Sequence, residues 1–349
     1  MDMVYNVPWD AKWIHHCGLA VYLFNLTMFC INCVMLCIRF YYHRKDIRHS
    51  FTDPVESLLS LIYIGLCQYG ISHAGIWLVR TGEILFWIYL VVSILFSATM
   101  YLILWSTQVF PIHTMTPGWV FPAYPLLMNM SCASSLMKAA DQRGFSLYTN
   151  PVVIAVMSLA AQATGCLLAF LVAAAFIYRL MTQKLPGDYQ RPGIFISIGP
   201  YAFTAAGILS MEQNKHLIIP SYVFQLPATA YLTHLHFLIP ALFLWSLAVW
   251  FFLVSVGSLF KYIRLRRKLP FQMAWWSFVF PNTALVVATQ MLGHSLQNWP
   301  LKLVAVVMAV VLMVGWVVVF TAMLRSLWRQ ELLLARVRSA RDGMVVLPV

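Results

Sequence analysis

Apolar runs long enough to cross a lipid bilayer follow one another along nearly the whole chain. A transmembrane helix needs about 20 predominantly apolar residues. Nine stretches meet this requirement, at approximately residues 14–40, 55–79, 84–106, 114–137, 151–180, 193–212, 232–260, 271–293 and 301–328. The pattern predicts an all-α integral membrane protein, with one transmembrane domain over residues 1–330 and a short basic tail over residues 331–349.

Two kinds of predicted span alternate along the chain. The odd-numbered spans are smoothly hydrophobic, whereas the even-numbered spans contain Pro, Gly and hydroxyl-bearing residues, as in TPGWVFPAYPLLMNMSCASS over residues 116–135. Small residues let helix backbones approach closely, and polar side chains form hydrogen bonds between membrane helices. The alternation therefore predicts helical hairpins around a central pore, in which the even-numbered helices line the pore and the odd-numbered helices shield it from lipid. Ordinary packing helices are the alternative, because Gly and Pro are frequent in membrane helices generally.

The eighth span contains MAWWSFVFPNTALVVAT over residues 273–289, with a proline in the middle of an apolar run. A proline inside a helix removes one backbone hydrogen bond and bends the helix. In hydrocarbon, the carbonyl group left free needs protein or water as a partner. We interpret the segment around Pro281 as part of a pathway lining, and a proline-kinked packing helix is the alternative. Candidate pore-lining residues in the even-numbered spans are Ser57, Pro122, Pro125, Gly199, Pro200, Thr204 and Thr283.

The distribution of positive charge predicts the orientation of the chain in the membrane. Charged residues make up only 10% of the sequence, and the formal net charge is +12. Of the 23 Lys and Arg residues, 17 follow odd-numbered spans. Because short cytoplasmic loops are enriched in Lys and Arg, we expect these segments and the C-terminus on the cytoplasmic side, with the N-terminus outside. This topology accounts for the net charge without a nucleic-acid partner.

The sequence offers few groups suited to catalysis or metal binding. No charged residue lies at mid-depth in a predicted span, which disfavours a pump with a charge relay. We find no nucleophile elbow, HExxH motif or P-loop, and we expect no enzyme activity, no cofactor and no metal site. An anion pathway would instead use helix N-termini, hydroxyl groups and backbone N–H groups. Arg191, at the start of the sixth span, would raise the local positive potential, and an ordinary cytoplasmic anchor is the alternative.

Four stretches of the chain form a specific combination. They are SFTDPVESL (residues 50–58), MYLILWSTQVFPIHTMTPGWVFPAYPLL (100–127), RPGIFISIGPYAFTAAGI (191–208) and MAWWSFVFPNTALVVAT (273–289). Together they resemble the tellurite-resistance/dicarboxylate transporter family, also called the voltage-dependent anion channel family, and within it the fungal malic acid transporters. The resemblance extends from about Val7 to Leu327.

This resemblance implies ten membrane helices arranged as five hairpins around a pore for small anions. It implies malate or other C4-dicarboxylates as substrates, with sulfite efflux as the alternative, and assembly as a homotrimer. It also implies that a Phe closes the pore, and this residue corresponds to Phe280, directly before Pro281. We expect the protein in the plasma membrane, because no organellar signal is visible.

One helix of the family pattern has no counterpart among the nine predicted spans. Residues 6–13, NVPWDAKW, resemble the link that follows the first helix of the family, so we expect that helix to be absent from this sequence. An incomplete gene model and a degenerate paralogue are the two explanations. In the second case, the chain would be a non-transporting membrane partner of a full-length relative.

Overall fold

Helices form most of the computed structural model, which describes residues 12–42, 64, 67, 76–107, 109, 111–187, 191–219, 227–265 and 271–329. Within these residues there is no β-strand, and five helical segments are long and apolar enough to cross a membrane. These segments are Ile76–Thr107, Pro151–Gln183, Arg191–Gln213, Tyr231–Phe260 and Trp299–Trp328. The predicted all-α membrane fold is therefore confirmed. Ser57, most of the predicted second span and the predicted tail lie outside the described residues.

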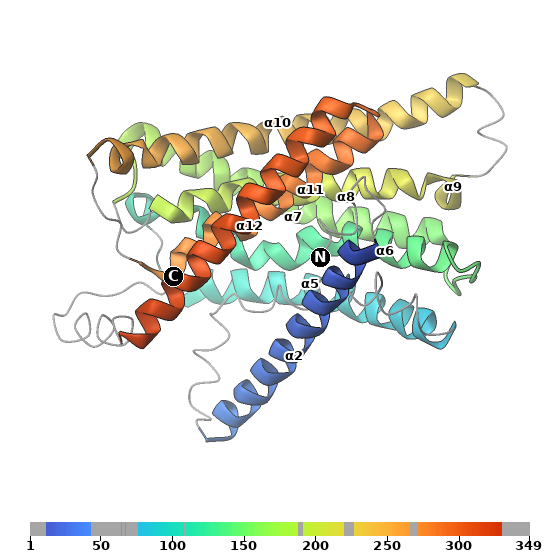
Figure 1. The fold of residues 1–349 in the computed structure, drawn as a ribbon, viewed down its shortest axis with the longest axis horizontal. Coiled ribbons are helices and arrows are strands. Elements are labelled where there is room, and N and C mark those ends of the chain that lie inside the picture. Colours follow the sequence, from blue (N-terminus) through green and yellow to red (C-terminus); the bar gives the residue numbers. More distant parts are fainter. Residues whose placement is uncertain are drawn as a thin grey trace.

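The odd-numbered predicted spans form long continuous α-helices (Figure 1). They are α2 (Lys12–Tyr42), α5 (Ile76–Thr107), α7 (Pro151–Gln183), α10 (Pro227–Leu265) and α12 (Trp299–Trp328). Two of these helices begin with the same device, an Asn cap followed by a Pro in the first turn. Asn150 Oδ1 accepts a hydrogen bond from the N–H of Val152 at 2.9 Å, and Asn298 Oδ1 accepts one from Leu301 at 3.1 Å. Each cap satisfies an N–H group that has no partner within the helix.

The even-numbered spans that the structure describes each consist of a 3-10 helix followed by an α-helix. The pairs are η5 (Pro117–Met128) with α6 (Asn129–Asp141), η6 (Arg191–Ile198) with α8 (Gly199–Gln213), and η8 (Met273–Phe278) with α11 (Phe280–Ser295). Two short helices lie outside these pairs, η4 (Ile112–Thr114) and α9 (Lys215–Ile218). We call the points where 3-10 helix changes to α-helix the junctions.

Prolines begin the α-helical part of two of these spans. Pro200 and Pro281 lie in the first turns of α8 and α11. First-turn N–H groups have no partner within the helix, so a proline there removes no intrahelical bond. The expected loss of a backbone hydrogen bond at Pro281 is therefore wrong, because Pro281 lies in the first turn of an α-helix that begins directly after the change of helix type at Val279. Pro122 and Pro125, in contrast, lie inside η5.

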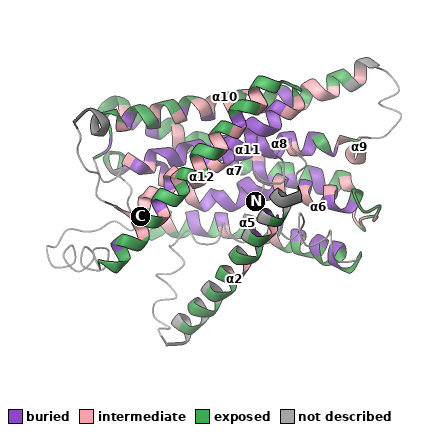
Figure 2. Cartoon of the chain, in the orientation of Figure 1, coloured by how far each residue is buried: buried purple, intermediate pink, exposed green. Residues whose placement is uncertain are grey.

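The helix α8 is mostly buried, whereas α12 crosses in front of the bundle and is mostly exposed or intermediate (Figure 2). In the most apolar 18-residue stretch of each span, 89% of the residues are buried in Arg191–Gln213, compared with 11% in Trp299–Trp328. The exposed face of α12 carries Val310, Val311 and Val314. Exposed aliphatic side chains of this kind suit contact with lipid, as we expect for the odd-numbered spans.

Gln162, on the long helix α7, forms hydrogen bonds with both α6 and α8. Its side chain is fully buried. The Oε1 atom accepts a hydrogen bond from the N–H of Met130 in α6 at 2.7 Å, and Nε2 donates one to the carbonyl of Phe203 in α8 at 3.1 Å. Gly207 makes this contact possible, because a Cβ atom there would lie 2.8 Å from Gln162 Nε2.

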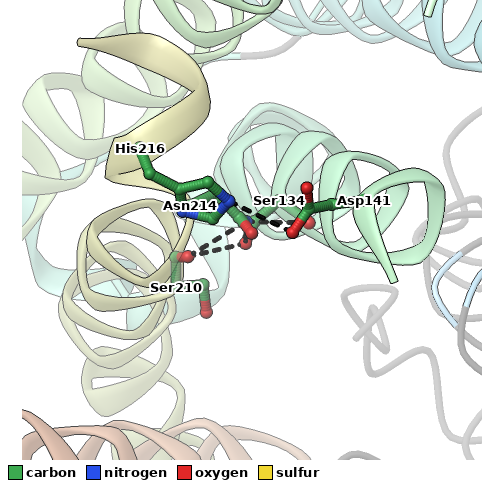
Figure 3. Close-up of polar contacts among 5 residues, drawn as sticks. All are labelled: Ser134, Asp141, Ser210, Asn214 and His216. Atoms are coloured by element: carbon green, nitrogen blue, oxygen red, sulfur yellow. Dashed lines mark hydrogen bonds and ion pairs between the residues drawn. The ribbon is translucent and has the colours of Figure 1, made fainter. Parts of the chain in front are cut away.

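Polar side chains also join α6 to the C-terminal end of α8 and to the short helix α9 that follows it (Figure 3). Asn214 Nδ2 donates hydrogen bonds to the Ser134 carbonyl at 3.0 Å and to the Ser134 hydroxyl at 2.8 Å. The Ser134 hydroxyl in turn donates to the carbonyl of Ser210 at 2.8 Å. In a more exposed position, His216 Nε2 lies 3.1 Å from Asp141 Oδ2. These segments are thus held together by side chains from both sides of the contact.

The buried carboxylate of Glu212 links the end of α8 to two further helices. His234 Nδ1 of α10 lies 2.5 Å from Glu212 Oε1, and the Ser295 hydroxyl of α11 donates to Oε2 at 2.7 Å. Lys215 Nζ lies 3.5 Å from Oε1. Because each carboxylate oxygen has a partner, this buried charge is paired as a low-dielectric environment requires.

Candidate functional site

Three aromatic rings meet at the junctions, and each ring comes from a different broken span. Tyr124 of η5 lies 5.6 Å from Phe280 of α11, measured between ring centroids, and Phe203 of α8 lies 5.4 Å from Phe280. Tyr124 and Phe203 are 6.3 Å apart. These spacings are those of favourable tilted or edge-to-face aromatic pairs. We call these three residues the aromatic cluster, and Phe280, the predicted gate, is one of its members.

Tyr124 connects the aromatic cluster to the neighbouring 3-10 helix. Its side chain is buried, and its hydroxyl donates a hydrogen bond to the carbonyl of Ile196 in η6 at 3.1 Å. The same hydroxyl lies against Gly199, where a Cβ atom would overlap it. Gly199, predicted to line the pore, therefore has a specific reason to lack a side chain: it leaves room for the Tyr124 hydroxyl.

The two threonines predicted to line the pore donate their hydroxyl protons to their own helices. Thr204 Oγ1 donates to the carbonyl of Pro200 at 2.7 Å, and Thr283 Oγ1 donates to the carbonyl of Val279 at 2.9 Å. Both bonds run to the residue four positions earlier, which is a common arrangement of Ser and Thr in membrane helices. In this structure, both hydroxyl protons are thus engaged within their own helices.

The carbonyl group of Pro125, another predicted lining residue, accepts hydrogen bonds from two side chains. Tyr89 of α5 donates to it at 2.5 Å, and Asn129 Nδ2 donates at 3.3 Å. Asn129 Nδ2 also lies 3.2 Å from the Ser93 hydroxyl of α5. Pro122 is buried in the same 3-10 helix. Backbone groups of a broken helix must be satisfied in this way inside a membrane, because lipid cannot do so.

The sequence interpretation did not identify Tyr89, Ser93 or Gln162, although all three support the broken spans. They lie on α5 and α7, which the hydrophobic pattern assigned to lipid shielding. Ser93 and Gln162 are among the few polar residues that are buried on these two helices. An isolated polar residue on an otherwise apolar membrane helix is therefore the sequence feature that could have indicated a contact with a broken span.

Arginine and serine side chains hold the 3-10 helices to their neighbours at the other end of the spans. Arg191 Nη1 donates to the carbonyl of Ser258 in α10 at 2.9 Å, and Arg191 Nε donates to that of Pro186 at 3.2 Å. The Ser277 hydroxyl of η8 donates to the carbonyl of Pro192 at 2.5 Å. These contacts favour the anchoring interpretation of Arg191 over a purely electrostatic one.

Backbone hydrogen bonds continue across the junctions. The α-helices α6, α8 and α11 all begin there directly after a 3-10 helix, and the carbonyls of Leu126 and Trp276 accept hydrogen bonds from the N–H groups of Asn129 and Val279. Among the described residues, no group of three His, Cys, Asp or Glu side chains is arranged to hold a metal ion. The described part of the site is therefore mainly aromatic, with Tyr124, Phe203 and Phe280 in mutual contact.

Comparisons with known proteins agree with this architecture. A model of the voltage-dependent anion channel family matches residues 2–324. The malic acid transport protein of Schizosaccharomyces pombe is 22% identical over 329 residues, covering 92% of this chain and 74% of that protein. A second protein of the same species, which carries a provisional malic acid transporter name, is 25% identical over 324 residues, covering 90% of this chain and 74% of that protein. The sulfite efflux pump of Arthroderma otae is 20% identical over 333 residues, covering 91% and 84%.

The family model spans most of the sequence, and the predicted resemblance is confirmed. The names of the family and of these relatives indicate a channel or transporter rather than an enzyme. This integral membrane chain belongs to the voltage-dependent anion channel family.

Proposed function

We propose that this chain transports small organic anions across a membrane, with malate or other C4-dicarboxylates as the first candidates. The anions pass through a conduit lined by the broken spans, and Phe280 is the gate. The two Schizosaccharomyces pombe relatives named for malic acid transport support this choice of substrate. Further parts of the proposal are a plasma-membrane location, a cytoplasmic C-terminus, as the charge distribution predicts, and a homotrimeric assembly.

The position of Phe280 is the observation that carries the proposal. Its ring lies at the first residue of α11 and packs against Tyr124 and Phe203, which belong to the two other described broken spans. A bulky ring at this position, where three broken spans meet, would obstruct an approaching anion. Movement of this one side chain would therefore change access along the conduit.

Replacement of Phe280 by Ala tests the gate. Two aromatic contacts, worth about 0.5–1.5 kcal/mol each, stabilise the closed position, so their loss favours the open state by roughly a factor of 5 or more. We expect Phe280→Ala to increase uptake of labelled malate in cells that express the chain. Phe252→Ala is the matched control, because Phe252 is also half-buried but packs against Phe195 instead of the aromatic cluster. Unchanged malate flux at normal surface expression would exclude the gate.

Sulfite efflux is the second candidate, because relatives named as sulfite efflux pumps match the chain along most of its length. Export of sulfite, measured in parallel in the same cells, separates the two substrates. Transport of either anion by the chain would also exclude the non-transporting alternative. Absence of both fluxes from a chain that reaches the membrane would favour that alternative.

A further inference from the structure

We propose that Tyr124 is a positioning residue for the gate, and that its hydroxyl fixes the surface against which Phe280 closes. The inference rests on the proposed function, because it needs Phe280 to act as a gate. Tyr124 lies on η5, 156 positions before Phe280 in the sequence, and no sequence motif relates the two residues.

The first argument is the connection that Tyr124 makes between spans. Its ring contacts Phe280 from one side, and its hydroxyl donates to the Ile196 carbonyl on η6. The segment η6 leads directly into α8, which supplies Phe203, the other ring in contact with Phe280. The hydrogen bond thus joins the two spans that enclose Phe280. It is the bond that fixes the Tyr124 ring itself, whereas the other bonds between these spans, through Gln162 and Asn214, do not involve Tyr124.

The second argument is steric and independent of the hydrogen bond. The Tyr124 hydroxyl occupies the space that a side chain on residue 199 would need. Packing at this point is therefore specific for Gly at residue 199 together with Tyr at residue 124. Gly199→Ala should displace the Tyr124 hydroxyl from Ile196 without altering Phe280 itself, and so it should reproduce the effect of removing the hydroxyl.

The test measures resting malate flux in Tyr124→Phe, which keeps the ring and removes only the hydroxyl. A buried hydrogen bond contributes enough that its loss should raise resting flux by about 2- to 10-fold. Tyr201→Phe is the matched control. Tyr201 is equally buried, and its hydroxyl donates to the Ala169 carbonyl at 3.2 Å, but its ring packs against Phe170 and Phe251 instead of the aromatic cluster.

The double variant Tyr124→Phe/Phe280→Ala separates a positioning role from general loosening of the bundle. If Tyr124 acts through Phe280, its substitution raises flux in the wild-type background and adds nothing in the Phe280→Ala background. Gly199→Ala should show the same dependence on Phe280.

Three results would overturn the inference: an equal rise with Tyr201→Phe, an additional rise in the Phe280→Ala background, or unchanged flux in Tyr124→Phe at normal surface expression. The failure of the proposed function is distinguishable from these results. If Phe280→Ala itself leaves flux unchanged, the gate is wrong, and the positioning role falls with it. If Phe280→Ala raises flux but Tyr124→Phe does not, the gate stands and only the role of Tyr124 is excluded.

Discussion

Removal of the Gln162 side-chain amide should destabilise the bundle measurably. In Gln162→Met the side chain keeps a similar length but loses both of its hydrogen bonds, one to the Met130 N–H and one to the Phe203 carbonyl. Hydrogen bonds between membrane helices contribute roughly 0.6–1.7 kcal/mol each. The Met130 N–H group lies in the first turn of α6, where it has no partner within the helix. Two lost bonds therefore correspond to a loss of about 1–3 kcal/mol.

The melting temperature of the purified protein in detergent measures this loss. One kcal/mol lowers the melting temperature of a domain of 150–250 residues by roughly 2–4 °C, so we expect a decrease of several degrees. Gln183→Met is the matched control, because Gln183 lies exposed at the end of the same helix. A melting temperature for Gln162→Met that equals that of the control would refute the reasoning, and would mean that α6 and α8 hold their positions without the amide.

Two further substitutions test the hydrogen bonds that the carboxylates of Glu212 and Glu83 accept. In Glu212→Gln the side chain has only one oxygen left to accept hydrogen bonds from His234 and Ser295, so the melting temperature should fall by a few degrees. The control is His236→Gln, at a neighbouring exposed histidine, which should leave the melting temperature unchanged. Equal decreases in the two variants would contradict the role of Glu212. Glu83 accepts backbone N–H bonds from Tyr148 and Thr149 at 3.0 and 2.6 Å, so Glu83→Gln should speed amide hydrogen exchange in residues 142–150, and unchanged exchange would show that the loop is held by other contacts.

The spans themselves could be predicted from the sequence because hydrophobicity is a local property. The fifth predicted span, residues 151–180, corresponds to α7 at Pro151–Gln183, and the sixth, residues 193–212, corresponds to Arg191–Gln213. The 3-10 helices could not be predicted in the same way. A proline is compatible with a kink, with a helix start or with a 3-10 segment, and only the surrounding packing decides among them. For this reason the sequence predicts a lost backbone hydrogen bond at Pro281, whereas in the structure this residue lies in the first turn of α11.

The contacts that support the aromatic cluster join residues far apart in the sequence. Tyr124 and Ile196 are 72 positions apart, and Gln162 bonds a residue 41 positions away. No local pattern contains this information, so Gly199 could be selected as a candidate but its partner could not. The bonds of Thr204 and Thr283 to their own helices are different, because they follow a known local habit of Ser and Thr. They could have been expected from the sequence alone.

The two helix types in the broken spans have a geometric consequence for motion. A 3-10 helix rises about 2.0 Å per residue with 3.0 residues per turn, whereas an α-helix rises about 1.5 Å with 3.6 residues per turn. If the six residues of η8 changed to α-helix, the segment would shorten by about 3 Å and unwind by about 120°. The segment η8 contains no proline, whereas η5 contains Pro122 and Pro125, whose rings are incompatible with an α-helix interior. The piece of chain directly before Phe280 thus contains no proline that opposes such a change, whereas the piece that carries Tyr124 contains two in its interior.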